Sequence, residues 1–70
     1  MKVLVNLTSR ECEVLRLISH GFTTKEIASS LFLSSHTIDS HRKRLMEKMD
    51  ARNTAVMIRA GFEAGFLKPN

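Results

Sequence analysis

The fold is decided by residues 24–41, which read TKEIASSLFLSSHTIDSH. Their spacing is typical of a helix-turn-helix, in which two helices meet at a steep angle through a turn of three or four residues. The crossing point needs an apolar residue followed by a small one, and Ile27 and Ala28 supply this pair. We expect Leu33 to fill the turn and Ile38 to anchor the second helix. A side chain larger than that of Ala28 would force the two helices apart.

Phe32 departs from this pattern at the turn. The turn position favours a left-handed backbone, which Gly adopts at the lowest cost. We therefore expect either an altered turn or a partly exposed Phe32.

Three helix starts share one local signature. Thr8 with Glu11, and Thr23 with Glu26, have the spacing of a capping box. Ser34 repeats the cap, but Thr37 stands where the acidic partner belongs, so the third box is incomplete. Each start also has a pair of apolar residues that can pack across it, namely Leu7 with Cys12, Phe22 with Ile27 and Leu33 with Ile38.

These signals predict short helices and tight turns. The first helix ends at His20-Gly21, with Gly21 in a left-handed conformation; the second spans about Thr24 to Leu31, the third about Ser35 to Met49, and the fourth runs from Asn53-Thr54 to before Gly65. We predict an all-α fold, a four-helix bundle containing a helix-turn-helix. Residues 1–70 form one domain, in which residues 1–6 are a flexible lead-in.

Size and composition restrict the possible function classes. A chain of 70 residues with 43% hydrophobic residues forms one folded domain, too small to enclose a catalytic pocket. We find no nucleophile–base pair, phosphate loop or paired carboxylates, so we do not expect an enzyme. The single cysteine, Cys12, excludes a disulfide framework and is expected to be a half-exposed thiol. There is no signal peptide and no apolar run near the roughly 20 residues that span a bilayer, so we expect no membrane contact and a reducing cytoplasm.

The histidines do not form a metal site. His36 and His41 are five residues apart, about 140° around a helix, and cannot chelate one ion together. His41 lies at the edge of the apolar face, where we expect a partly buried packing role. We therefore expect no metal, no cofactor and no small-molecule ligand within this chain.

Positive charge is concentrated in one stretch. The charges of residues 1–40 sum to zero, residues 41–52 carry +3, and the remainder adds +1. This distribution is typical of a protein with a polyanionic partner.

The third helix separates apolar from polar residues. Ile38, Leu45 and Met49 lie on one side and are expected to face inward. The opposite side carries polar and basic residues, namely His36, Ser40, Lys43, Arg44 and Glu47, with Asp39 at its border. Such a helix suits the DNA major groove, and Ser34, Ser35 and Thr37 at its start can grip phosphate. The alternative is an ordinary solvated amphipathic helix.

The fourth helix has more apolar surface than one core needs. Met57, Ile58, Gly61 and Phe62 form an inward stripe. The other side shows Ala55, Val56 and Ala60, flanked by Arg59 and Glu63 at i, i+4 spacing. We predict that these outer residues form a small two-fold contact and hence a weak dimer.

The sequence resembles the LuxR-type (GerE-like) helix-turn-helix domain of bacterial transcriptional regulators over about Leu7 to Leu67. The resemblance rests on residues 7–11 with Val14-Leu15, on residues 21–28, on Leu33-Ser34 and Thr37-Ile38, on His41, and on residues 47–49. It implies a four-helix bundle, a dimer through the last helix, and recognition of inverted repeats in double-stranded DNA. It also implies that Asp39, Ser40 and Lys43 approach bases. Asp39 departs from the Lys common there, and could accept a bond from a cytosine amino group or position Lys43 or Arg44.

The candidate site residues fall into three groups. We expect base contacts from His36, Asp39, Ser40 and Lys43, and a dimer interface of Ala55, Val56, Arg59, Ala60 and Glu63. Phosphate contacts are expected from Thr24, Lys25, Ser35, Thr37, Arg42, Arg44, Lys48, Arg52 and Asn53, with Arg42 extending along Met46.

The leading function is sequence-specific transcription regulation. A second possibility is a protein-interaction module, in which the fourth helix or the basic face holds another regulator or RNA polymerase. The sequence leaves open the operator, the sign of regulation, the upstream signal, and whether the chain is a complete regulator or a C-terminal domain.

Overall fold

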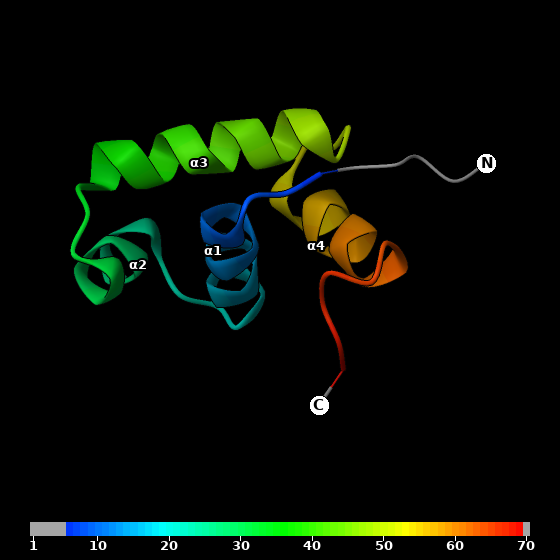
Figure 1. Ribbon diagram of the computed structural model, residues 1–70, viewed down its shortest axis with the longest axis horizontal. Coiled ribbons are helices and arrows are strands. Elements are labelled where there is room, and N and C mark those ends of the chain that lie inside the picture. Colours follow the sequence, from blue (N-terminus) through cyan, green and yellow to red (C-terminus); the bar gives the residue numbers. More distant parts are fainter. Residues whose placement is uncertain (1–5, 70) are drawn as a thin grey trace.

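The computed structural model describes residues 6–69, which form four α-helices and no strand. The helices are α1 (Ser9–Ser19), α2 (Thr24–Leu31), α3 (Ser35–Lys48) and α4 (Thr54–Glu63). α3 extends along one side of the molecule, and α1 packs against each of the other three helices (Figure 1). The all-α prediction is confirmed. Of the predicted lead-in, residues 1–5 lie outside the described residues, and the carbonyl of Asn6 accepts a hydrogen bond from Lys48.

The predicted caps start the helices. Thr8 and Thr23 form complete capping boxes, in which each threonine N–H donates to the glutamate three residues later at 2.9 Å. Ser34 caps α3 alone, accepting from the N–H of Thr37 at 3.1 Å. Asn53 caps α4 through its Oδ1. These side chains satisfy N–H groups that a helix start otherwise leaves without a partner.

All four helices end in the same kind of turn. The turn residue has positive φ at Gly21, Phe32, Asp50 and Gly65, and the next N–H donates to a carbonyl five residues back. This is the Schellman arrangement. At Phe32 (φ 57°, ψ 41°) the following N–H, that of Leu33, donates to the Ala28 carbonyl at 2.9 Å.

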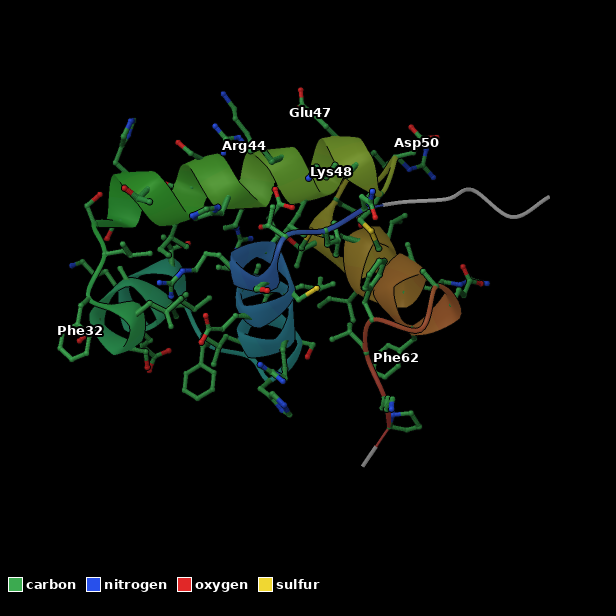
Figure 2. The ribbon with its side chains drawn as sticks, viewed as in Figure 1. Phe32, Arg44, Glu47, Lys48, Asp50 and Phe62 are labelled. Atoms are coloured by element: carbon green, nitrogen blue, oxygen red, sulfur yellow. The ribbon has the colours of Figure 1, made fainter. Side chains whose placement is uncertain are left out.

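The expectation of an altered turn at Phe32 is therefore wrong. The turn is retained with a phenylalanine in it because Leu33 must pack against the core immediately afterwards. The alternative expectation, exposure, is confirmed: the side chain is 94% exposed at the end of the molecule (Figure 2).

The core joins all four helices. Its ten residues are Val14, Leu15, Ile18, Ile27, Ala28, Ile38, Leu45, Met49, Met57 and Leu67. The predicted helix-turn-helix contacts are confirmed, since Ile27, Ala28 and Ile38 are buried and Leu33 packs against them. Burying one such aliphatic side chain contributes about 1.5–3 kcal/mol.

α4 is turned differently from the prediction. Met57 and Gly61 are buried as expected, but Phe62 is 44% exposed and the expectation that it faces inward is wrong. The reason is Leu67, which folds back over Gly61: a Cβ on Gly61 would lie 2.8 Å from Leu67 Cδ1. Leu67 fills the place that Phe62 was expected to fill. Ala60, expected on the outside, is half-buried against the core.

Candidate nucleic-acid interface

One side of α3 is polar and uncovered. We define the outer edge of α3 as His36, Asp39, Ser40, Lys43, Arg44 and Glu47, all of which are exposed except Ser40, which is half-buried. On the opposite side of the same helix, Ile38 and Leu45 are fully buried. Arg44 and Glu47 lie along the side of α3 turned away from α1 (Figure 2). The core therefore holds the helix rigidly and leaves its outer edge open to a partner.

Two side chains on this edge can offer a hydrogen-bond acceptor to a base. Ser40 Oγ donates to the His36 carbonyl at 3.2 Å, so its hydroxyl oxygen is directed to accept a further bond. Asp39 is exposed, and among residues 6–69 no ion pair joins it to Lys43 or Arg44. Its carboxylate is thus available as an acceptor, the group that a cytosine amino group requires.

The start of α3 offers hydrogen-bond donors. Ser34 Oγ lies 2.9 Å from Thr37 Oγ1 and also accepts from the Thr37 N–H, so both hydroxyls are engaged locally. The N–H groups of Ser35 and His36 precede the first intrahelical bond of α3, which begins at Ile38. Free N–H groups at a helix N-terminus suit a phosphate. Lys25 is exposed and Thr24 half-buried on neighbouring α2.

Arg42 has a different position from the one expected. Its Nη2 donates to Thr54 Oγ1 at 3.1 Å, and the side chain is half-buried between α3 and α4. This hydrogen bond links α4 to α3, and the expected phosphate contact of Arg42 stays a prediction.

Lys48 is also engaged within the chain. Its Nζ lies 2.7 Å from Glu11 Oε1 and 3.0 Å from the carbonyl oxygen of Asn6. Glu11 is only 2% exposed. Lys48 thus forms an ion pair between α3 and α1, and its expected phosphate contact stays a prediction. Sequence reasoning assigned Glu11 only to its capping box, because local spacing carries no signal for a partner 37 residues away.

The Glu11 carboxylate stays charged although it is buried. Burial opposes the charged form, but the hydrogen bonds from Lys48 and from the Thr8 N–H outweigh it and lower the pKa of Glu11. One carboxylate thus both caps α1 and binds the C-terminal turn of α3.

The remaining candidates lie on the surface or beside the core. Arg52 and Asn53 are exposed after α3, although Asn53 uses its Oδ1 as the α4 cap. His41 is half-buried, as expected, and its Nδ1 is buried without a hydrogen-bond partner among the described residues. Cys12 is half-exposed, also as expected. Residues 6–69 contain no group of three His, Cys, Asp or Glu side chains placed to hold a metal.

The outer side of α4 is open as well. Arg59 Nε lies 3.8 Å from Glu63 Oε2, with the two side chains 80% and 68% exposed. Ala55 is exposed and Val56 half-buried beside them. No helix within the described range is long and apolar enough to cross a membrane.

This combination defines a class: a small helical domain built around a helix-turn-helix whose second helix has an uncovered polar side. Residues 5–60 match the family described as "Bacterial regulatory proteins, luxR family" (GerE). The chain belongs to this family, and it is a LuxR-type DNA-binding domain of the kind found in transcription regulators.

Curated relatives agree with this assignment. The chain is 42% identical over 59 residues to the uncharacterized response regulatory protein YgeK of Escherichia coli, covering 84% of this chain and 40% of that protein. It is 38% identical over 52 residues to BvgA of Bordetella pertussis, a putative positive transcription regulator of virulence factors, covering 74% and 25%. The chain thus spans less than half the length of these relatives.

Solved structures share the fold. The response regulator ChrA of a heme-sensing two-component system superposes with a TM-score of 0.86 at 26% identity, over 94% of this chain and 33% of ChrA. VqmA of Vibrio cholerae, in a complex with ligand and DNA, superposes with a TM-score of 0.83 at 29% identity, over 94% of this chain and 29% of VqmA.

Proposed function

We propose that this chain regulates transcription by binding double-stranded DNA in a sequence-specific manner, with α3 in the major groove. The observation that carries the proposal is the contrast between the two sides of α3. Ile38 and Leu45 are fully buried, whereas five of the six residues of the outer edge are exposed. A helix held rigidly by its apolar side loses little conformational entropy when its polar side enters a groove.

The outer edge supplies the base contacts in this proposal. His36, Asp39, Ser40 and Lys43 lie nearest the start of α3, the part of a recognition helix that reaches bases in helix-turn-helix proteins. Their donors and acceptors can distinguish base pairs in the major groove.

Phosphate contacts come from the residues around the outer edge. These are Thr24, Lys25, Ser35, Thr37, Arg44, Arg52 and Asn53, with the α3 N-terminus adding backbone N–H groups. Arg42 and Lys48 belong to the proposed set as well, although each, like Thr37 and Asn53, has a hydrogen-bond partner within the chain.

We further propose a dimer through α4 on an inverted repeat. Ala55, Val56, Arg59 and Glu63 form the contact, and Ala60 contributes less because it is half-buried against the core. The solved relative VqmA of Vibrio cholerae is described as a dimer, which supports a two-fold arrangement. In a symmetric contact, Arg59 and Glu63 can pair with their equivalents across the axis.

Selection of bound sequences from random duplex DNA tests the proposal. We expect an enriched motif with two inverted half-sites, spaced by about one helical turn. Absence of any enriched motif would contradict sequence-specific binding, and a motif with one half-site would contradict the dimer.

Val56→Glu tests the dimer separately. The buried charge should lower affinity for a two-half-site duplex by about tenfold or more while leaving the weaker binding to a single half-site unchanged. Val56→Ile, which keeps an apolar side chain, is the matched control. Equal binding of both variants to the two-half-site duplex would remove α4 from the interface.

A further inference from the structure

A second basic surface lies away from the outer edge of α3. The end of α1, the end of α4 and the chain after α4 surround an open hollow of about 440 Å³. We define the α1–α4 groove by Arg16, His20, Phe62, Phe66, Lys68 and Pro69, which line it. The ends of α1 and α4 that form it are directed away from α3, and Phe62 lies at this side of the molecule (Figures 1 and 2).

The charge of the groove has one sign. Arg16, His20 and Lys68 are all exposed, and none of the groove-lining residues is acidic. Among residues 6–69, no ion pair joins any of these three to a carboxylate. Arg16 and Lys68 therefore lack the carboxylate partners that other cations of the described chain have. Lys48 pairs with Glu11, Arg10 with Glu13, and Arg59 with Glu63.

Two phenylalanines line the groove together with its polar residues. Phe62 is 44% exposed and Phe66 half-buried, and Pro69 stands beside them. Aromatic rings left open on a small domain are typical of contact surfaces. Their position beside the cations Arg16 and Lys68 restricts the ligand, because it must bring both apolar and negatively charged groups.

We infer that the α1–α4 groove binds an acidic peptide segment of a partner protein, one with a large apolar side chain between carboxylates. Arg16 and Lys68 pair with the carboxylates, and Phe62 and Phe66 cover the apolar side chain. Duplex DNA suits this surface poorly, because the apolar groups that it exposes, the thymine methyls, lie within its major groove and do not project into a concave site.

The groove and the DNA-binding surface can be occupied together. α3 lies across the molecule from the groove (Figure 1). On α4, Phe62 lies about 20° around the helix from Ala55 and about 60° from Arg59, so the groove borders the proposed dimer contact. The inference does not rest on DNA binding and goes beyond it: a domain bound to DNA through α3 retains a second surface for a protein.

The test uses the full chain and a synthetic peptide, acetyl-Asp-Glu-Leu-Phe-Asp-Glu-amide. Amide chemical shifts of the labelled chain are followed by NMR as the peptide is added, up to about 1 mM, the range of weak peptide affinities. We expect shifts centred on residues 16–20 and 62–69, and saturation within this range. The same shifts are expected when the chain is bound to its selected DNA.

Variants of the chain and control peptides test the charge contacts and the apolar contacts separately. Arg16→Glu and Lys68→Glu should each weaken binding by about tenfold, since each reverses one contact charge. Arg10→Glu, on the same helix but outside the groove, should change it less than about twofold. A peptide with Asn and Gln in place of the acids, and one with Ser in place of Leu and Phe, should both fail to saturate.

Several outcomes would overturn the inference. They are the absence of shifts at about 1 mM, shifts centred on α3, an equal loss in Arg10→Glu, or undiminished binding of either control peptide. If a single-stranded oligothymidylate displaced the peptide and bound the groove more tightly than the peptide does, the groove would be a nucleic-acid site. Circular dichroism of each variant verifies that it is folded, and DNA binding by the same samples is scored independently.

Discussion

The molecule has two basic surfaces that differ in what lies between the charges. The outer edge of α3 places Lys43 and Arg44 among polar side chains and contains no apolar residue. The α1–α4 groove places Arg16, His20 and Lys68 around two phenylalanines. The first surface is a ridge on a rigid helix, and the second is a hollow between elements.

The comparison teaches that net charge alone does not identify a partner. Both surfaces attract negative charge, but a ridge of donors and acceptors matches base edges, whereas aromatic rings match apolar side chains. The outer edge of α3 is also supported from within the molecule. α3 is held by Ile38 and Leu45 from inside and by the Glu11–Lys48 pair near its C-terminal end.

The largest expected effect comes from removing the anchor of α3. Ile38→Ala should lower the free energy of unfolding by about 2–5 kcal/mol, because it leaves a cavity in a fully buried site. Because so small a domain unfolds as one unit, the substitution should reduce binding at the outer edge of α3 and binding in the α1–α4 groove together. Urea denaturation followed by circular dichroism measures the change, with Ile38→Val, at about 0.5–1.5 kcal/mol, as the control. A loss under 1 kcal/mol would show that the buried side chain does not anchor the helix.

The next effect concerns the ion pair between α3 and α1. Lys48→Met should lower the free energy of unfolding by about 1–3 kcal/mol at pH 7, since the buried Glu11 carboxylate loses its counter-charge while the lysine is partly solvated. Lys43→Met, on the exposed edge of the same helix, should change it by less than about 0.5 kcal/mol. Equal effects of the two substitutions would mean that the pair adds nothing.

The two cations of the outer edge should differ in DNA binding. Lys43→Ala should reduce discrimination between selected and random DNA by about 1–3 kcal/mol if it contacts a base. Arg44→Ala should weaken binding to all sequences and reduce the salt slope by about one unit. Fluorescence anisotropy at several salt concentrations measures both, and neither substitution should affect peptide binding in the groove. A uniform loss in Lys43→Ala would remove Lys43 from base recognition.

A smaller effect depends on pH. Because the pKa of Glu11 is lower in the folded chain than in the unfolded one, the carboxylate stabilises the fold above its ordinary pKa of about 4.3. This contribution to stability is lost as the pH falls through the lowered pKa that Glu11 has in the folded chain. Glu11→Gln should therefore be less stable than the unaltered chain at pH 7, with the gap closing in acid. A gap that stays constant across this range would assign the loss to packing.

The smallest effect is expected at the helix-turn-helix turn. Phe32→Gly should raise the free energy of unfolding by up to about 1 kcal/mol, because φ is positive and almost no buried surface is lost. Phe22→Gly, at a residue outside the positive-φ turn positions, is the control and should not stabilise the chain. Thermal unfolding compares them, and a destabilised Phe32→Gly would show that the exposed ring has a contact that stabilises the fold.

Much of the architecture could be predicted from local sequence. Thr8, Thr23 and Ser34 mark helix starts by side-chain hydrogen bonds that span only three residues, so their spacing is sufficient to identify them. The buried side of α3 follows from the helical period, since Ile38, Leu45 and Met49 recur on one side. The exposed residues opposite them followed from the same period.

Contacts between distant segments required the tertiary structure. Lys48 and Arg42 look like free cations in the sequence, but they bind Glu11 and Thr54 because helix packing brings these partners to them. Leu67 folds onto Gly61, and Phe62 is left exposed beside the groove that it lines. The sequence by itself determined where helices begin and which side of α3 is buried, since both depend on neighbours within a few residues. Tertiary packing decided which charges remain free for a partner, because that depends on groups that meet only in the folded chain.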